Sequence, residues 1–326
     1  MKKRANILII RLRSIGDIVL TLPAVHAVRE HYPDARITYL TRSSNSALLE
    51  GFKEVDEILT LDQKAITDPL RALPELFRLI YRLRAGRFSL VVDLQGYGET
   101  AWFSWLTGAP KRWGSIYSRG RKWAYTQSIP RNTNLHPIER DLLLLRTCGI
   151  RMSEPENQFS IPEDAINQAK ALFEKTQLDP EKPSLYIQPF TSNERKNWPF
   201  MNYIAVAEYW RDQGIQVLFG GGPNDAPNLE LARERGFPAF SNTPLLVSAG
   251  LMHLSSLIIG GDTGMIHLAM AQNKRVLMLI NGCSPGQANL YQHNEWVIQA
   301  NDPESFKQLP VETVNVKCRE LIFSAA

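Results

Sequence analysis

The residues of this chain that could do chemistry lie in short segments directly after predicted strands. The first segment is Arg11–Asp17 (RLRSIGD), which overlaps the end of an apolar run at residues 6–12. Gly16 permits a tight turn there, and Asp17 falls at the start of the following helical pattern. Asp17 fits a general base, or equally a helix cap, because Asp is a preferred cap and favours the helix dipole.

The strongest segment is Ile258–Gly264 (IIGGDTG), which runs from a strand into a helix that carries His267. Glycines permit close backbone approach, and the free N–H groups and positive dipole end of a helix suit a phosphate. Thr263 adds a hydroxyl donor. The alternative is a helix capped by Asp262, with His267 as a packed surface residue.

Two other loops of the same half carry polar groups that could support such a site. Ser192–Pro199 (SNERKNWP) places Arg195 and Lys196 after a strand, where lysine could neutralise a leaving phosphate as a compact point charge. Gly220–Asp225 (GGGPND) is a second glycine-rich strand end, whose Asp225 could accept from ribose hydroxyls. A solvated charged loop and a turn-forming aspartate are the respective alternatives.

The first half contains a segment in which aromatic and basic residues alternate. Trp102, Phe103 and Trp105 are followed by further cations and tryptophans, namely Lys111, Arg112, Trp113, Arg119, Arg121, Lys122 and Trp123. Such a pattern can meet an anionic amphiphile or a nucleic acid. A core helix followed by a solvated basic loop is the alternative.

The elements that must position these residues alternate between strand and helix in both halves. Apolar strand-like runs lie at residues 6–12, 36–40, 55–61, 89–94, 184–188, 215–219, 256–259 and 275–280. Helical patterns lie at residues 18–30, 69–85, 163–176 and 201–213. This alternation predicts an α/β protein of two Rossmann-like, doubly wound domains facing a central cleft, with ligands beyond the carboxyl ends of the strands.

The domain boundary is expected in the stretch from residue 154 to 183, which is richer in proline and charge. We expect an N-terminal domain at residues 1–155 and a C-terminal domain at residues 156–326. Whether the last helix packs back on the first domain is left open.

Composition excludes several classes of protein. A chain of 326 residues that is 44% hydrophobic and 21% charged is too apolar for disorder, and a net charge of +4 does not indicate a general nucleic-acid binder. Three scattered cysteines fit reduced thiols in a cytoplasm better than a disulfide framework or a zinc site. Arg11, Arg13 and Asp17 interrupt the first apolar stretch, which argues against a signal peptide.

Taken together, these segments resemble the ADP-heptose:lipopolysaccharide heptosyltransferases of glycosyltransferase family 9. The resemblance is carried, in the family's order, by RLRSIGDIVLTLPA at residues 11–24, Asp93-Leu-Gln-Gly96, Lys196 with Trp198-Pro199, and DTGMIHL at residues 262–268. It spans both halves. The chain departs from the family pattern at two places. Asn281–Gly286 (NGCSPG) stands in place of a Gly-Pro-Thr-Asp-Pro-like run, and Met265 stands where proline is frequent. These departures bear on the identity of the donor more than on the type of reaction.

The resemblance implies a GT-B fold and an inverting, metal-independent transfer of heptose from ADP-heptose to the lipopolysaccharide inner core, without a cofactor. The lack of a D-x-D motif agrees with this. Asp17 matches the catalytic base and Lys196 the lysine on the donor phosphates. Other donor-binding candidates are Ser192, Asp225, Asp262, Thr263, Gly264 and His267. The candidates for binding a lipid A–core acceptor are Arg13, Arg112, Arg119 and Arg121.

These assignments describe a cytoplasmic enzyme in peripheral contact with the inner face of the cytoplasmic membrane, without a nucleic-acid partner. Three alternatives remain. One is a transferase of the same fold that uses another nucleotide sugar. The second is a nicotinamide-dependent oxidoreductase, which the missing G-x-G-x-x-G motif disfavours. The third is a non-catalytic protein that binds RNA or membrane.

Overall fold

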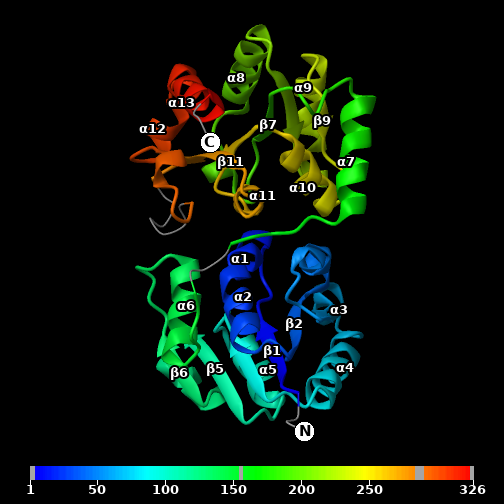
Figure 1. Cartoon of the computed structure of the whole chain (residues 1–326), viewed down its shortest axis with the longest axis vertical. Coiled ribbons are helices and arrows are strands. Elements are labelled where there is room, and N and C mark those ends of the chain that lie inside the picture. The colour runs from blue at the N-terminus through cyan, green and yellow to red at the C-terminus, as the bar shows by residue number, and fades with distance from the viewer. Residues whose placement is uncertain (1–3, 154–156, 283–289, 324–326) are drawn as a thin grey trace. The chain divides into compact units, whose positions relative to one another are not determined.

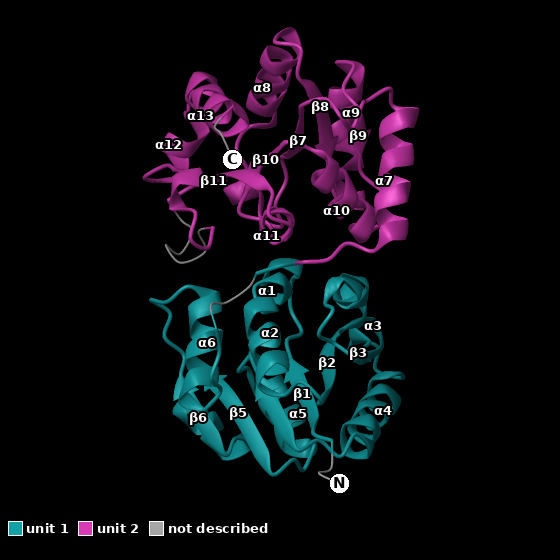
Figure 2. Cartoon of the chain, viewed as in Figure 1, with its two compact units in different colours: residues 1–158 teal, residues 159–326 magenta. Residues whose placement is uncertain are grey.

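The computed structural model describes residues 4–153, 157–282 and 290–323. The chain divides into two compact units, residues 1–158 and 159–326 (Figures 1 and 2). Each unit contains a six-stranded sheet whose neighbouring strands pair in parallel. The predicted fold class, two Rossmann-like α/β units, is confirmed.

In the first unit the strand order is β3-β2-β1-β4-β5-β6. The strands are β1 (Asn6–Ile10), β2 (Arg36–Arg42), β3 (Glu57–Leu61), β4 (Leu90–Asp93), β5 (Lys111–Ile116) and β6 (Gln127–Pro130). β1 is central and pairs with β2 on one side and β4 on the other, with Ile9 opposite both Tyr39 and Val92. The direction of winding therefore reverses beside β1, which is where sheets of this kind bind ligands.

The helices of the first unit are α1 (Ile15–Val19), α2 (Leu22–His31), α3 (Gln63–Thr67), α4 (Ala72–Ala85), α5 (Gly98–Leu106) and α6 (Pro137–Thr147). Short 3₁₀ segments, η1 (Ser43–Gly51) and η2 (Arg119–Ala124), complete it. The single helix predicted over residues 18–30 is wrong, because it divides into α1 and α2. Pro23, in the first turn of α2, has no N–H to donate to Val19 and so cannot continue α1.

In the second unit the strand order is β12-β11-β10-β7-β8-β9. The strands are β7 (Ser184–Gln188), β8 (Gln216–Gly220), β9 (Ala239–Phe240), β10 (Leu257–Gly261), β11 (Arg275–Ile280) and β12 (Val297–Gln299). The helices are α7 (Glu163–Lys175), α8 (Phe200–Asp212), α9 (Ala226–Glu234), α10 (Leu245–Leu254), α11 (Gly264–Met270), α12 (Pro303–Lys307) and α13 (Val311–Phe323). The 3₁₀ segments are η3 (Glu194–Lys196), η4 (Pro223–Asp225) and η5 (Asn294–Trp296).

The last helix, α13, packs against α8 and β11 of its own unit. Its side chains Val314, Cys318 and Leu321 belong to the same buried cluster as Trp210 and Leu277. Among the described residues, no helix is long and apolar enough to cross a membrane.

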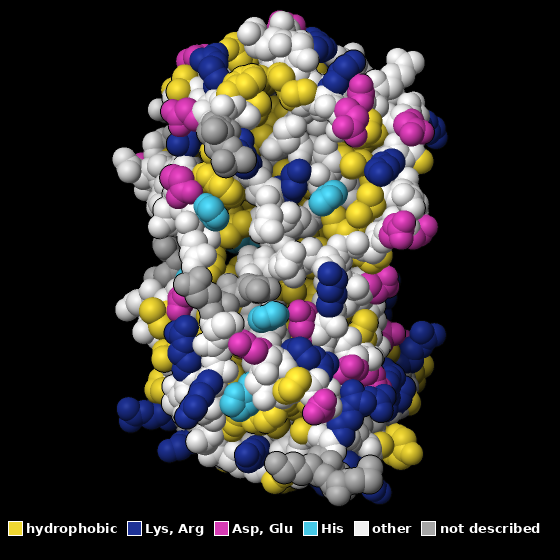
Figure 3. Space-filling model, in the orientation of Figure 1, with side chains coloured by type: hydrophobic (Ala, Val, Ile, Leu, Met, Phe, Trp, Pro, Cys, Tyr) yellow, Lys and Arg dark blue, Asp and Glu magenta, His cyan; other side chains and the backbone are white. Residues whose placement is uncertain are grey.

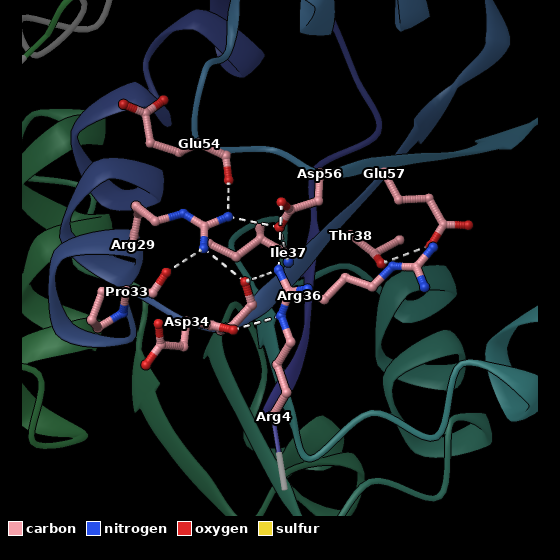
Figure 4. Close-up of polar contacts among 11 residues, drawn as sticks. Arg4, Arg29, Pro33, Asp34, Arg36, Ile37, Thr38, Glu54, Asp56 and Glu57 are labelled. Atoms are coloured by element: carbon pink, nitrogen blue, oxygen red, sulfur yellow. Dashed lines mark hydrogen bonds and ion pairs between the residues drawn. The ribbon is translucent and has the colours of Figure 1, made fainter.

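The amino ends of the first three strands are joined by a network of arginines and carboxylates (Figure 4). Arg29 donates to the Asp56 carboxylate at 2.7 Å, and the same carboxylate accepts from the Ile37 backbone N–H at 2.7 Å. Arg36 pairs with Glu57 at 3.1 Å across the starts of β2 and β3. These contacts fix the strands in register at this edge of the sheet.

Candidate functional site

Asp17 lies in the first turn of α1, just beyond the carboxyl end of β1. The preceding Ser14 adopts a left-handed backbone conformation at φ 46°, and its hydroxyl accepts from the Asp17 backbone N–H at 3.2 Å. The Asp17 carboxylate accepts a hydrogen bond from Arg11 at 2.6 Å. Its side chain is 38% exposed, whereas that of Arg11 is 3% exposed. The turn therefore presents an accessible carboxylate on a buried cation.

Arg11 is held rigidly beneath Asp17. Its guanidinium also donates to the Leu94 carbonyl at the end of β4. Burial alone would lower the pKa of Arg11, but the carboxylates of Asp17 and Asp141 outweigh this effect and raise it. Burial raises the pKa of Asp141, on α6, to about 6, although Arg11 and Arg131 act in the opposite direction.

The predicted Asp93-Leu-Gln-Gly96 motif forms a structural turn at the carboxyl end of β4. The buried Asp93 carboxylate accepts from the backbone N–H groups of Gln95 and Gly96, each at 2.9 Å, and from the Tyr125 hydroxyl at 2.6 Å. Gly96 is required because φ is 70° and an added Cβ would lie 1.7 Å from the Ser115 carbonyl oxygen. The Gln95 side chain accepts from the Leu12 N–H at 3.1 Å, so the turn supports the loop that carries Asp17.

Beside this turn, two arginines enclose two tyrosines in a continuous stack. The Arg13 guanidinium lies 4.6 Å from the Tyr97 ring centre, the Tyr97 and Tyr117 ring centres are 4.9 Å apart, and Arg131 lies 4.5 Å from the Tyr117 ring centre. Arg13 was predicted, but the other three residues were missed. The available signal was position: Tyr117 directly follows β5 and Arg131 directly follows β6.

The other three predicted acceptor residues have different surroundings. Arg121 reaches the same edge, where it donates to the Gly96 carbonyl at 2.9 Å. Arg119 is exposed on η2. Arg112 lies at the amino end of β5, where its guanidinium donates to the carbonyls of Ala124 and Ala109. Arg112 therefore fastens backbone at the edge of the sheet opposite to Asp17, away from Arg13 and Arg121.

In the second unit, three predicted residues come together at the carboxyl edge of the sheet. Lys196, on η3, donates to the Asp262 carboxylate at 2.6 Å, and His267 Nε2 lies 3.7 Å from the other Asp262 oxygen. Burial would raise the pKa of Asp262, but the neighbouring His267 and the hydrogen-bonded Lys196 outweigh it and lower that pKa. Asp262 is therefore an anion that holds a lysine and a buried histidine at one point.

The remaining donor candidates surround this cluster. Thr263 precedes α11 and makes no side-chain capping bond, so its hydroxyl is not used by the helix. Ser192 is exposed on the loop after β7. Asp225 accepts from the Gly222 N–H at 2.8 Å, which is the turn-forming role that the sequence left open. Most of the atypical Asn281–Gly286 run lies outside the described residues, but Asn281 donates to the Arg195 carbonyl beside Lys196.

The glycines before Asp262 are needed for close packing of strands. A Cβ at Gly260 would lie 2.6 Å from the Gln188 carbonyl oxygen of β7, and one at Gly261 would lie 2.8 Å from Thr191 Cγ2. These glycines therefore let β10 approach the loop that carries Lys196. Within the described parts of the chain, no group of three or more His, Cys, Asp or Glu side chains is arranged to hold a metal ion.

Several known proteins resemble this chain over most of its length. The profile of glycosyltransferase family 9 (heptosyltransferase) matches residues 76–315. The lipopolysaccharide core heptosyltransferase OpsX of Haemophilus influenzae is 20% identical over 93% of this chain and 86% of its own length. The lipopolysaccharide heptosyltransferase 1 of Campylobacter coli is 26% identical over 89% of this chain and 87% of its own length.

Solved structures share the fold over nearly the whole chain. A glycosyltransferase of family 9 from Veillonella parvula superposes with a TM-score of 0.88 at 20% identity and covers 100% of this chain and 99% of its own. The Escherichia coli ADP-heptose lipopolysaccharide heptosyltransferase II superposes with a TM-score of 0.81 at 20% identity, covering 97% and 98%. The Escherichia coli heptosyltransferase WaaC with ADP gives 0.78 at 17% identity, covering 97% and 99%.

Proposed function

Because this chain belongs to glycosyltransferase family 9, the heptosyltransferases, we propose that it transfers a heptose from ADP-heptose to the lipopolysaccharide inner core with inversion at the anomeric carbon. The observation that carries the proposal is the accessible Asp17 carboxylate, fixed by Arg11 at the edge where parallel sheets bind ligands. The names of the relatives, and of a solved structure with ADP-2-deoxy-2-fluoro heptose, support this choice of substrates.

Asp17 is the proposed general base. Its carboxylate takes the proton from an acceptor hydroxyl, whose oxygen forms a bond to the anomeric carbon of the donor. The bond from that carbon to the diphosphate oxygen breaks, and ADP leaves with the electron pair. Arg11 keeps the carboxylate in position throughout, because its other hydrogen bond anchors it to β4.

The leaving diphosphate is the proposed ligand of the second unit's edge. In this proposal Lys196 and the backbone N–H groups at Thr263 and Gly264 stabilise its charge, and Ser192 lies beside it. Asp225, whose Oδ2 accepts from Gly222 in the turn, accepts from the ribose through Oδ1. Asp262 holds Lys196 there, His267 lies beside the other Asp262 oxygen, and both Asp262 and His267 border the transferred sugar in this proposal. A lysine and backbone donors can stabilise the developing charge by themselves, so the proposed reaction needs no metal ion.

The acceptor's inner sugars are the proposed ligands of the first unit's edge. Sugar rings stack on aromatic faces, and arginines bind carboxylates and phosphates in a fixed, two-pronged geometry. Tyr97 and Tyr117 offer aromatic faces for stacking, and the anionic groups are bound by Arg13, Arg131 and Arg121. Arg119 is placed at the outer margin. Because a lipid A–core acceptor is anchored in a membrane, the proposed enzyme works in the cytoplasm, in peripheral contact with the membrane surface. No nucleic acid takes part in the proposed reaction.

The test is a transfer assay with the full chain, ADP-heptose and a deacylated, water-soluble inner-core acceptor. We expect a product heavier by one heptose residue, with the anomeric configuration opposite to that of the donor by NMR, and equal yield in excess EDTA. If another nucleotide sugar supports transfer and ADP-heptose does not, the proposed donor is wrong. Loss of transfer on chelation, restored by magnesium or manganese, would contradict the metal-free mechanism. RNA binding without any transfer would overturn the proposal.

A further inference from the structure

Helix α4 carries a line of apolar side chains on the side that faces away from its sheet. Its inner residue Leu79 is fully buried, whereas Leu73, Phe77 and Tyr81 are 64%, 68% and 73% exposed. Residues four apart lie above one another on a helix, so these three form one stripe, and Leu70, in the turn just before the helix, is exposed as well. A helix that only covered a sheet would present polar side chains there.

Three tryptophans form a second exposed apolar cluster. Trp102 and Trp105 come from α5 and Trp123 from η2, and their side chains are between 44% and 52% exposed. Their ring centres are 5.8, 4.6 and 6.0 Å apart in the three pairs, so the indoles pack on one another at the surface. Contiguous exposed apolar surface of this kind usually marks an interaction site.

The stripe and the tryptophans border each other on one helical layer. α4 packs against α5, and Phe103 of α5 shares a buried cluster with Leu79. At the ends of the two helices, an added Cβ on Gly108 would lie 3.3 Å from Nη1 of Arg84. We call this surface the α4–α5 face, and its apolar members are Leu70, Leu73, Phe77, Tyr81, Trp102, Trp105 and Trp123.

Basic side chains surround the apolar members, and Figure 3 shows Lys and Arg gathered with hydrophobic side chains over α4. The nearby acids are already paired, since Asp68 contacts Arg71 and Glu75 contacts Arg78. Within the described residues, no ion pair engages the four exposed cations Arg84, Arg87, Lys111 and Lys122. The rim of the face is therefore positive.

We propose that the α4–α5 face docks on the surface of an anionic phospholipid bilayer. Aromatic rings are favoured at the headgroup level, and each basic residue near an anionic surface adds to the attraction. A second copy of the chain fits less well, because a two-fold contact would place the same four cations against one another. The inference rests on the proposed function only in that a lipid-linked acceptor brings the protein to a membrane.

The experiment measures binding of the full chain to vesicles, with neither donor nor acceptor present. Vesicles of phosphatidylethanolamine with phosphatidylglycerol are compared with pure phosphatidylcholine in a flotation assay at low and high salt. We expect wild type to bind the anionic vesicles, more weakly at high salt, and the Phe77→Ser/Tyr81→Ser variant to bind at least about tenfold more weakly. Brominated lipids should quench wild-type tryptophan fluorescence, because three indoles lie on the docking face.

The matched control is Met201→Ser/Val316→Ser, which removes two exposed apolar side chains of the second unit and should bind as wild type does. Circular dichroism checks that each variant is folded. Equal vesicle binding by wild type and the Phe77→Ser/Tyr81→Ser variant would overturn the inference, as would no binding by wild type. A wild-type dimer that this variant converts to monomer, without vesicle binding, would assign the face to self-association instead.

Transfer to the water-soluble acceptor is measured separately on the same samples. Wild type and the Phe77→Ser/Tyr81→Ser variant should give equal rates, because the docking face contains none of the proposed catalytic or acceptor-binding residues. No transfer by either protein would contradict the proposed function while leaving the vesicle result to decide the docking face. A loss of transfer in the variant alone would contradict the separation of docking from catalysis.

Discussion

The amino and carboxyl edges of the first sheet both contain arginines and carboxylates, but these residues have different roles at the two edges. At the amino edge, arginines and carboxylates satisfy one another: Arg29 pairs with Asp56 and Arg36 with Glu57 (Figure 4). Hydrogen bonds from Ile37 and Arg29 outweigh the effect of burial and lower the pKa of Asp56. Charges that are paired in this way fasten strands together and leave little for a ligand to bind.

At the carboxyl edge, arginines lie close to one another, so that burial and their mutual repulsion both disfavour the charged form of Arg140. Burial and the neighbouring Arg131 and Arg11 lower the pKa of Arg140, although Asp141 opposes them. Asp141 itself has its pKa raised to about 6 by burial. Crowded cations of this kind favour an anionic ligand, as the proposed acceptor site requires, and the difference between the edges can be tested by substituting equivalent residues in both.

The largest effect is expected from Asp17→Asn at the carboxyl edge. Removal of a general base typically costs about 100- to 10,000-fold in rate, so kcat should fall by that much while ADP affinity stays the same. The control is Asp56→Asn at the amino edge, which should retain wild-type kcat and lose only about 1–2 kcal/mol of unfolding free energy. Steady-state kinetics and calorimetry measure these quantities. An Asp17→Asn enzyme within a few-fold of wild type would remove Asp17 from catalysis.

The comparison extends to the second sheet through Lys196→Ala. Loss of a group that stabilises developing negative charge should lower kcat by about 100-fold or more and should also weaken ADP binding. Lys196→Arg should restore only part of both, because a planar guanidinium does not replace a point charge. The control is Lys274→Ala, just before β11 at the amino edge, where the lysine donates to the His253 carbonyl at 2.8 Å. Unchanged ADP affinity in Lys196→Ala would exclude Lys196 from the donor site.

A smaller effect is expected from the arginines that meet the acceptor. Arg121→Gln and Arg131→Gln should each raise the KM for acceptor by about tenfold, because each removes one charge-assisted hydrogen bond. Their kcat and ADP affinity should change little. Arg36→Gln, the amino-edge control, should leave the acceptor KM unaltered. Equal acceptor KM values in all four proteins would mean that the stack of Arg13, Tyr97, Tyr117 and Arg131 is structural only.

The sequence-predicted candidates Lys196, Asp262 and His267 lie together in the second unit. The glycines before Asp262 indicated one strand end, and Lys196 was chosen because its loop directly follows another strand. Tyr117 and Arg131 were missed because they join Arg13 only through the order β1-β4-β5-β6, which no local pattern reveals. The sites of the second unit remain predictions, as do those of the first, until substrates are tested.

Two other differences have physical causes that lie beyond local sequence. Arg112 belongs to a basic run, but nothing in that run shows that it lies near the start of β5, where its guanidinium donates to the carbonyls of Ala109 and Ala124. The helical pattern over residues 69–85 did not indicate which of its apolar residues are buried: in α4, Leu79 and Leu83 are buried, whereas Phe77 and Tyr81 are exposed. Periodicity shows that apolar residues align, but tertiary packing decides which line is buried.

The smallest expected effect is on stability: the contributions of Asp141 and Asp56 to the unfolding free energy should change with pH in opposite directions. The pKa of Asp141 is raised, so the folded state binds this proton more tightly than the unfolded state does. Its contribution to stability is complete below about pH 4 and is lost as pH rises through about 6. Asp141→Asn cannot ionise and escapes this loss. From about pH 4.5 to 6.5, the wild type should therefore lose about 1–3 kcal/mol of unfolding free energy relative to Asp141→Asn.

The pKa of Asp56 is lowered, so its contribution is present at higher pH and is lost only as pH falls through that low pKa. The difference between wild type and Asp56→Asn should consequently stay constant above about pH 5. Urea titrations of the three proteins across this range decide the point. If the unfolding free energies of wild type and Asp141→Asn change with pH in parallel, the arginines at the carboxyl edge compensate the charge of buried Asp141 as fully as those at the amino edge compensate Asp56.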